Sequence, residues 1–213
     1  MKILLIGASG NIGQRVLKEA LSKGYSVTAA QRHPAAVNIQ NSKLIVIYGD
    51  LLKQQELSAL LDGNEIIISA ISPTGALTPQ LFKKANENLI DALRHQDKRI
   101  IVVGGAGCLE ISPGLKVMDS PLWSQLPAEW KPDIIAHNEV LELYKKSGLN
   151  WTYFSPAKDV QAGERTGKYR LGTTNMIFDE NGESSISYED YATALVEEIK
   201  EERFLRQQFS IGY

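Results

Sequence analysis

Several features that define common protein classes are scarce in this chain. It has one cysteine, Cys108, which excludes an internal disulfide framework and a multi-cysteine metal site. Its three histidines lie far apart in the sequence, so we expect no metal centre. The formal net charge of −2 is too close to zero to favour a nucleic acid or an anionic membrane surface as a partner.

Long hydrophobic runs are also absent. The apolar run in residues 3–7, "ILLIG", is shorter than the apolar core of a signal peptide. No run approaches the ~18 apolar residues that a membrane-spanning helix needs. We therefore expect a soluble, cytoplasmic protein with no membrane partner. The sequence leaves the oligomeric state open.

The chain instead alternates strand-like and helix-like segments. Short apolar runs predict strands at residues 2–7, 25–31, 43–49, 65–71, 99–105 and 149–155, and the central ones lack alternation, as expected for strands covered on both faces. Segments with apolar residues at helical spacing lie between them, at residues 11–23, 53–61, 79–95 and 133–147. This alternation predicts an α/β fold, a doubly wound parallel sheet with helices on both faces. With no linker or repeat in view, we expect one domain over residues 1–213.

The C-terminal part departs from this alternation. Residues 166–172 and 175–187 predict strands around turns, and Asn181-Gly182 is a strong turn signal. Ser187 followed by Asp190 predicts a capped helix, and residues 207–213 predict a last strand. Residues 109–132 hold four prolines and two tryptophans without periodicity, and connections of this length are often functional lids.

A glycine loop follows the first predicted strand and opens the first predicted helix. In "GASGNIG" we expect Gly7 to allow a sharp turn, Gly10 to let a ligand touch the backbone, and Gly13 to let the helix pack close to the strand. The helix begins there with free N–H groups and a positive dipole end, which attract phosphate. The context predicts a dinucleotide site, although the spacing G-x-x-G-x-x-G is not the commonest one.

The residues after the second predicted strand indicate which dinucleotide binds. Sites for NAD place an acidic residue there, whereas an arginine suits the 2′-phosphate of NADP. No acid occurs between residues 26 and 36, and Arg32 stands at the end of the strand. We therefore expect NADPH as cofactor, with NADH as the alternative and a plain surface arginine as the other interpretation of Arg32.

The motifs "GASGNIG", "VTAAQR", "VIYGDL" and "VVGGAG", with "GLNWTYFSPA" and "GESSISYEDYA" downstream, resemble an atypical short-chain dehydrogenase/reductase. The group they are most similar to is the NAD(P)H-binding one known as NADH-flavin reductases, related to biliverdin reductase B and NmrA-type proteins. The resemblance spans nearly the whole chain. It implies a Rossmann-type sheet with a small C-terminal substrate region, and a role in nicotinamide chemistry.

The resemblance also implies roles for individual residues. By this likeness the pyrophosphate contacts are Gly7, Ser9, Gly10, Asn11 and Ile12, with Arg32 at the 2′-phosphate. It further implies Asp50 and Leu51 at the adenine, Ala70 and Ile71 at the ribose, Gly104 and Gly105 under the nicotinamide, and Ser155 and Pro156 at its carboxamide. Two structural alternatives stay open: Asp50 as a cap for helix 53–61, and Pro156 as the end of a strand.

One departure from the family matters for the chemistry. Ordinary members donate a proton from a Tyr-x-x-x-Lys pair, but no tyrosine here has a lysine four residues later. Ala106 stands where their assisting serine usually lies. Alcohol and ketone chemistry needs such an acid. The missing pair therefore disfavours an epimerase or dehydratase and leaves two readings: hydride transfer to a flavin or quinone-like acceptor, or a non-catalytic NADP(H)-binding redox sensor.

Three further residues are candidates at the acceptor. Trp123 and Trp130, in the proline-rich segment, either stack on an acceptor ring or pack the loop. His137 shares a helical stripe with Ile134 and Leu141 and either donates a proton or hydrogen bond as a catalytic residue, or is a buried packing residue.

Two other features favour structural roles. For Cys108 we expect a small buried residue, because no basic neighbour in the sequence lowers its pKa. The basic stretch "GERTGKYR" either meets an anionic group such as a flavin phosphate or forms a solvated hairpin.

Overall fold

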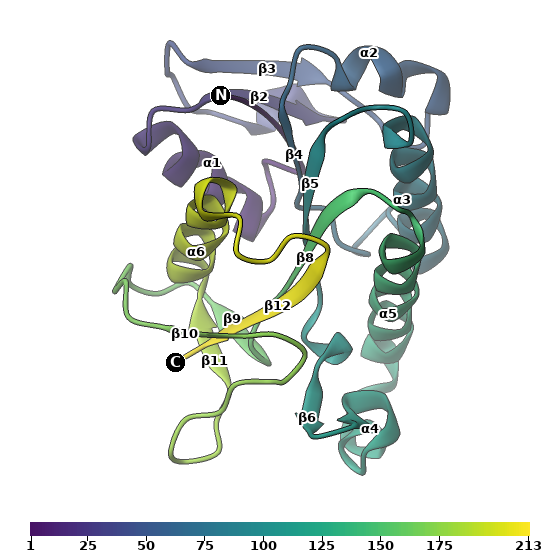
Figure 1. Ribbon diagram of the computed structural model, residues 1–213, viewed down its shortest axis with the longest axis vertical. Coiled ribbons are helices and arrows are strands. Elements are labelled where there is room, and N and C mark those ends of the chain that lie inside the picture. The colour runs from purple at the N-terminus through teal and green to yellow at the C-terminus, as the bar shows by residue number, and fades with distance from the viewer.

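A single twisted sheet dominates the computed structural model, which describes residues 1–213 (Figure 1). Its strands lie in the order β10-β12-β8-β5-β4-β1-β2-β3, and every neighbouring pair is parallel except β10 with β12. These strands are β1 (Lys2–Ile6), β2 (Ser26–Gln31), β3 (Leu44–Tyr48), β4 (Ile66–Ser69), β5 (Arg99–Val103), β8 (Asn150–Ser155), β10 (Arg170–Gly172) and β12 (Gln207–Gly212).

Helices cover both faces of this sheet. On one face lie α1 (Asn11–Ser22) and α6 (Tyr188–Glu201), and on the other lie α2 (Leu57–Leu61), α3 (Pro79–Leu93) and α5 (Lys131–Lys146) (Figure 1). The predicted α/β fold, a Rossmann-type doubly wound sheet, is confirmed. None of these helices is both long enough and apolar enough to span a bilayer.

The two faces separate because side chains alternate along each strand. In β1, Ile3 and Leu5 face α1 and α6, whereas Leu4 and Ile6 face the opposite helices. Strands buried on both faces read as continuous apolar runs, which is why these segments lack polar alternation.

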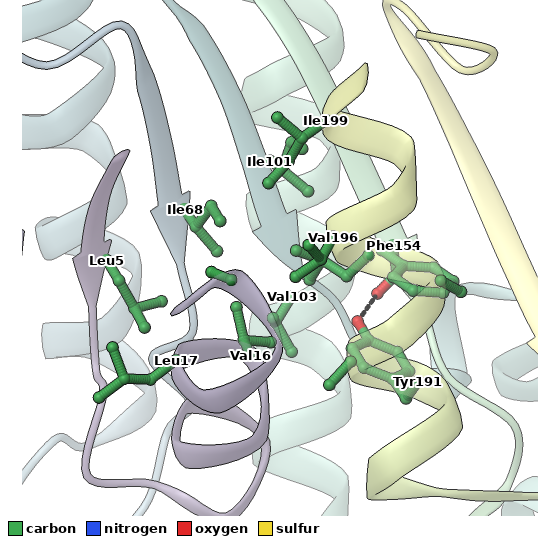
Figure 2. Close-up of a cluster of buried hydrophobic side chains, with 14 of the residues drawn as sticks. Leu5, Val16, Leu17, Ile68, Ile101, Val103, Phe154, Tyr191, Val196 and Ile199 are labelled. Atoms are coloured by element: carbon green, nitrogen blue, oxygen red, sulfur yellow. Dashed lines mark hydrogen bonds between the residues drawn. The ribbon is translucent and has the colours of Figure 1, made fainter. Parts of the chain in front are cut away.

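Three aromatic rings stack in the core on the side of the sheet that α1 and α6 cover, and Figure 2 shows two of them, Phe154 and Tyr191. The Phe154 ring lies with its centroid 4.1 Å from that of Tyr191 and 3.7 Å from that of Phe209. The Tyr191 hydroxyl donates a 2.6 Å hydrogen bond to the carbonyl of Phe154 (Figure 2). A buried hydroxyl needs such a partner, so this bond fixes α6 against β8.

Most predicted element boundaries hold within a few residues. The helix predicted at 53–61 begins as a 3-10 turn over Gln54–Glu56 and becomes α-helical only in α2. The helix predicted at 133–147 starts earlier, at Lys131, because a proline in the first turn is compatible with a helix start.

The prediction of strands around turns in residues 166–172 and 175–187 was only partly right. Arg170–Gly172 and β11 (Ser185–Ser187) form strands, and β11 pairs in parallel with β9 (Asp159–Gln161). Between them only Asn175 is paired, in an isolated bridge to Glu110. The Asn181-Gly182 turn forms, with Gly182 at φ +81°, but it joins no hairpin strands.

The long segment 109–132 is a chain of short elements. It contains the hairpin of β6 (Glu110–Ser112) and β7 (Leu115–Lys116), the short helix α4 (Leu122–Gln125), and 3-10 turns before and after α4. In Figure 1 this segment lies beyond one end of the sheet, below α5. It forms one wall of a cavity described below.

Candidate functional site

The loop between β1 and α1 has the backbone geometry expected from its glycines. Gly7 has φ +85°, and a Cβ there would lie 2.7 Å from the Ala70 carbonyl oxygen. A Cβ on Gly13 would lie 2.1 Å from the Gly7 carbonyl oxygen, so the helix can start this close to the strand only with glycine. Gly10 differs, since a Cβ there would meet nothing nearer than the Gly7 oxygen at 3.5 Å.

The start of α1 is open to a ligand. No side chain caps it, and the backbone N–H groups of Asn11, Ile12 and Gly13 donate no hydrogen bond within the protein. Ser9, Gly10 and Asn11 are exposed. Free N–H donors at a helix N-terminus, with no side chain over them, fit the pyrophosphate of a dinucleotide.

A cavity of about 190 Å³ lies beside this loop, at the carboxyl ends of β1, β2 and β3. Its lining includes six of the predicted cofactor residues: Gly7, Ser9, Arg32, Asp50, Leu51 and Ile71. The fold therefore gathers these residues, from separate segments of the chain, into one cavity next to the glycine loop. An adenosine attached to a pyrophosphate at that loop would lie there.

Of the two charged residues predicted at the cofactor, Arg32 has no partner within the protein, whereas Asp50 is hydrogen-bonded to the backbone. Arg32 is exposed, and its guanidinium makes no hydrogen bond or ion pair with the protein, so it is free to bind an anion. The Asp50 carboxylate accepts a 3.0 Å hydrogen bond from the Leu52 N–H. Asp50 thus closes a turn that precedes the helical segment. The interpretation of Asp50 as the helix cap is wrong, because the cap position of the 3-10 turn Gln54–Glu56 is Lys53.

Other predicted cofactor residues are less accessible. Ser155 is fully buried, and its hydroxyl accepts a 3.0 Å hydrogen bond from Gln208 Nε2. Pro156 is buried beyond the end of β8. Gly104 is buried against the Tyr153 ring, and a Cβ there would lie 2.2 Å from Tyr153 Cε1. Packing thus accounts for a glycine at position 104, and any contact to the cofactor is through backbone.

A second, larger cavity of about 500 Å³ opens at the carboxyl ends of β5 and β8. Its lining is mainly apolar and comes from five separate segments: residues 105–107, 117–130, 133–137, 158–161 and 176–178. Gly105 and Ala106 form the part next to β5. Volumes of this size suit small organic ligands, and the carboxyl edge of an open α/β sheet is where they usually bind.

His137 lines this cavity from α5, beside Gly105. Its Nδ1 lies 3.1 Å from the Tyr153 hydroxyl, which donates a 3.0 Å hydrogen bond to the His137 carbonyl. Burial lowers the pKa of His137 to about 4. The ring is therefore neutral at pH 7, and the expectation that it supplies a proton as an imidazolium is not supported.

Only one of the two predicted tryptophans lies at the cavity. Trp130 lines it and is 56% exposed. Trp123 lies outside the lining, with Lys131 Nζ 5.3 Å from its ring centroid. A role in stacking on an acceptor therefore remains a prediction for Trp130, which lines the cavity.

The cavity also contains residues that sequence reasoning missed. Asp133 lies one helical turn before His137 on α5, a spacing that could have identified it. Met176 and Phe178 point to the cavity from an irregular segment, and their i, i+2 spacing was visible in the sequence. Lys158 and Asp159 form a 3.6 Å ion pair at the β8–β9 turn, which no local pattern indicated.

Cys108 and the basic stretch at residues 163–170 have the structural roles expected from the sequence. Cys108 is buried, and burial raises the pKa of its thiol to about 12, so it is not a reactive thiolate. In the basic stretch, Arg165 pairs with Glu19 of α1 at 2.7 Å. Arg170 donates to the carbonyls of Phe178 and Tyr213. These arginines hold the C-terminal region together rather than facing either cavity.

Comparison with known proteins identifies the family. The model of a family described as NAD(P)H-binding matches residues 7–202. This chain belongs to that NAD(P)H-binding family. The match contains the glycine loop, Arg32 and both cavities, and it confirms the resemblance to the atypical short-chain dehydrogenase/reductase group.

Relatives cover the whole chain. The Bacillus subtilis (strain 168) protein YwnB is 34% identical over 99% of this chain and 98% of its own length. A "putative epimerase" from Bacteroides thetaiotaomicron is 40% identical with a TM-score of 0.90, covering 100% of this chain and 96% of that one. A "putative NADH-flavin reductase" from Streptococcus pneumoniae TIGR4 is 34% identical with a TM-score of 0.86, covering 100% and 99%. The fold is thus that of NAD(P)-binding oxidoreductases.

Proposed function

We propose that this protein is an NADPH-dependent reductase that transfers a hydride directly to a flavin or flavin-like acceptor. The observation that carries this proposal is the position of the apolar 500 Å³ cavity, which meets Gly105 and Ala106 at the same sheet edge as the glycine loop. When bound, the nicotinamide supplies two electrons and one proton as hydride, and a second proton comes from water.

The two buried tyrosines nearest the site are not suited to donate a proton to a ketone. Tyr153 is buried, its hydroxyl is already bound to His137, and burial raises its pKa well above the usual value. Tyr144 is also buried, and its hydroxyl donates to Asn86 Oδ1 at 3.1 Å. An electron-poor ring needs no acid from the protein at the moment of hydride transfer, so positioning is sufficient.

The choice of NADPH over NADH rests on Arg32. Its guanidinium is unpaired and lines the cavity beside the glycine loop, and no acid from β2 competes for the ribose. A free guanidinium can bind a phosphate in bidentate fashion.

The test is NADPH oxidation by the purified protein, followed by absorbance, with riboflavin, FMN, FAD, biliverdin, quinones and simple ketones each assayed separately. We expect turnover with at least one planar conjugated acceptor and none with ketones. Tight NADPH binding without turnover on the whole panel would favour the redox-sensor alternative. Steady ketone reduction would show that a proton donor was overlooked.

A matched pair of variants links turnover to the cavity. Trp130→Ala removes an aromatic wall, so the kcat/KM for the acceptor should fall while the Kd for NADPH stays unchanged. Trp123→Ala is the control, because Trp123 belongs to the same segment but does not line the cavity. If kcat/KM falls equally in both variants, the loss comes from destabilising segment 109–132 and not from the missing cavity wall.

A further inference from the structure

The hydrogen bonds around Tyr153 determine which nitrogen of His137 carries its proton. The Tyr153 hydroxyl lies 3.0 Å from the His137 carbonyl oxygen and 3.1 Å from His137 Nδ1. Two oxygens at 3.0 Å repel each other unless a proton lies between them, so the single tyrosine proton points to the carbonyl. Nδ1 must then carry the imidazole proton and donate it to the Tyr153 oxygen.

His137 Nε2 is consequently an unprotonated acceptor. It makes no hydrogen bond within the protein, yet it is not among the buried polar atoms that lack a partner, so it reaches the solvent space of the cavity. Gly105 packs against Cγ and Cδ2 of the ring, which leaves Nε2 as the polar atom that the ring presents to a ligand.

Asp133 adds a second acceptor on the same helix face. It stands four residues before His137, which places both side chains on one stripe of α5, and both line the cavity. The Asp133 carboxylate has no hydrogen-bond or ion-pair partner, and burial raises its pKa. Both titratable side chains that α5 contributes to the cavity therefore accept hydrogen bonds, and neither is neutralised by the protein.

We propose that His137 Nε2, with Asp133 beside it, accepts a hydrogen bond from a ring N–H of the bound acceptor. The substrate class is then a flavin-type heterocycle with a free imide N–H, and not a quinone. A quinone would present only carbonyl oxygens, which repel an imidazole lone pair and a carboxylate. This inference rests on the proposed function and makes His137 and Asp133 determinants of acceptor specificity.

The experiment compares lumiflavin with 3-methyllumiflavin, which lacks only the imide N–H. Binding is measured by quenching of flavin fluorescence in protein saturated with NADP⁺, and turnover by NADPH oxidation. Wild type should bind lumiflavin more tightly by roughly 2- to 13-fold, the effect of one net hydrogen bond. His137→Phe should weaken lumiflavin binding and remove most of this preference, whereas His137→Gln, which offers an oxygen near Nε2, should restore part of it.

Asp133→Asn gives an independent arm, since the Asp133 carboxylate makes no hydrogen bond or ion pair within the protein and asparagine keeps the size of the side chain. It should reduce the preference for lumiflavin even if His137→Phe does not fold. Equal binding of the two flavins to wild type would overturn the inference, as would a preference that persists in Asp133→Asn and in the His137 variants.

The outcomes also separate this inference from the proposed function. Preferential binding of lumiflavin without NADPH oxidation would support the recognition by α5 and overturn the reductase. Reduction of menadione with no binding of either flavin would overturn the recognition by α5 and leave a reductase of another acceptor class. Absence of binding by both flavins and of all turnover would overturn both.

Discussion

At the scale of single residues, glycines in one loop are required for different physical reasons. Gly13 is held against the Gly7 carbonyl, and Gly7 itself needs a positive φ. Gly10 has an extended conformation with φ −72° and ψ 166°, which any residue can adopt. The packing alone therefore does not explain a glycine at position 10, and we propose that a closely approaching ligand does.

We expect Gly10→Val to abolish NADPH binding with little change in thermal stability, because its side chain would project into the space above the free N–H groups of α1. Titration of NADPH and a thermal melt measure the two effects. Gly13→Ala is the matched control and should destabilise the fold itself, since its Cβ would overlap the Gly7 carbonyl. Normal NADPH binding by Gly10→Val would remove the loop from the cofactor site.

Arg32 is expected to set the choice of cofactor. A charge-assisted hydrogen bond contributes about 1.5–3 kcal/mol, so Arg32→Ala should weaken NADPH binding by roughly 10- to 150-fold. The affinity for NADH should barely change, because its ribose carries no phosphate. His33→Ala, in the exposed residue next along the same cavity, is the control. Equal losses for both cofactors would assign Arg32 to the adenine or to the fold.

Burial of neutral His137 should also appear in the pH dependence of stability. Its pKa is about 4 in the folded protein and about 6.5 in an unfolded chain. As the pH falls from 6.5 to 4, the unfolded chain gains a proton that the folded one lacks, so the free energy of unfolding should decrease by about 3 kcal/mol. Urea denaturation across this range should show a shallower decrease in His137→Phe. Parallel curves for the two proteins would contradict the burial of this ring.

At the scale of elements, the two residues that predicted the start of α6, Ser187 and Asp190, have different roles in the structure. Ser187 caps the helix as predicted, accepting a 3.0 Å hydrogen bond from the Asp190 N–H. The Asp190 carboxylate does not complete the capping box. It accepts instead from Thr166, the Gly167 N–H and the Tyr213 hydroxyl, and so ties the exposed loop 162–168 to the helix.

Asp190→Asn should therefore destabilise the protein by about 1–3 kcal/mol at pH 7. Burial alone would raise the pKa of Asp190, but the hydrogen bonds from Thr166, Gly167 and Tyr213 outweigh it and lower the pKa. The stabilisation is present above the unfolded pKa and is lost as the pH falls through the folded one, so the two melting curves should converge in acid. Asp91→Asn, at an exposed ion pair on α3, should change stability by less than about 0.5 kcal/mol.

How far the sequence predicted these elements depended on where their partners lie. The buried parallel strands are continuous apolar runs, their helices have apolar residues at helical spacing, and the glycine loop is a contiguous motif, so all three were predictable. Strand β11 pairs with β9 across an intervening loop, and no local pattern encodes that pairing. The larger cavity draws on five segments, of which the sequence identified Gly105, Trp130 and His137, whereas Trp123 does not line it.

At the scale of the whole molecule, one sheet takes its strands from residues 2 to 212. We propose that residues 1–213 are one cooperative domain. Far-ultraviolet circular dichroism and tryptophan fluorescence should give the same melting midpoint, because Trp151 is buried in β8 while Trp130 reports on segment 109–132. NADPH should raise both midpoints together. Two separate midpoints would divide the chain into independent units.

The place of β12 between β8 and β10 has a consequence for synthesis in the cell. A ribosome delivers β10 before the strand that must pair with it, and the β8 edge stays uncovered until residues 207–212 emerge. Until then the nascent chain presents the unpaired edge of an apolar strand, which other chains can join. Association through this edge should be limited by a chaperone that covers β8 or by rapid pairing of β8 with residues 207–212.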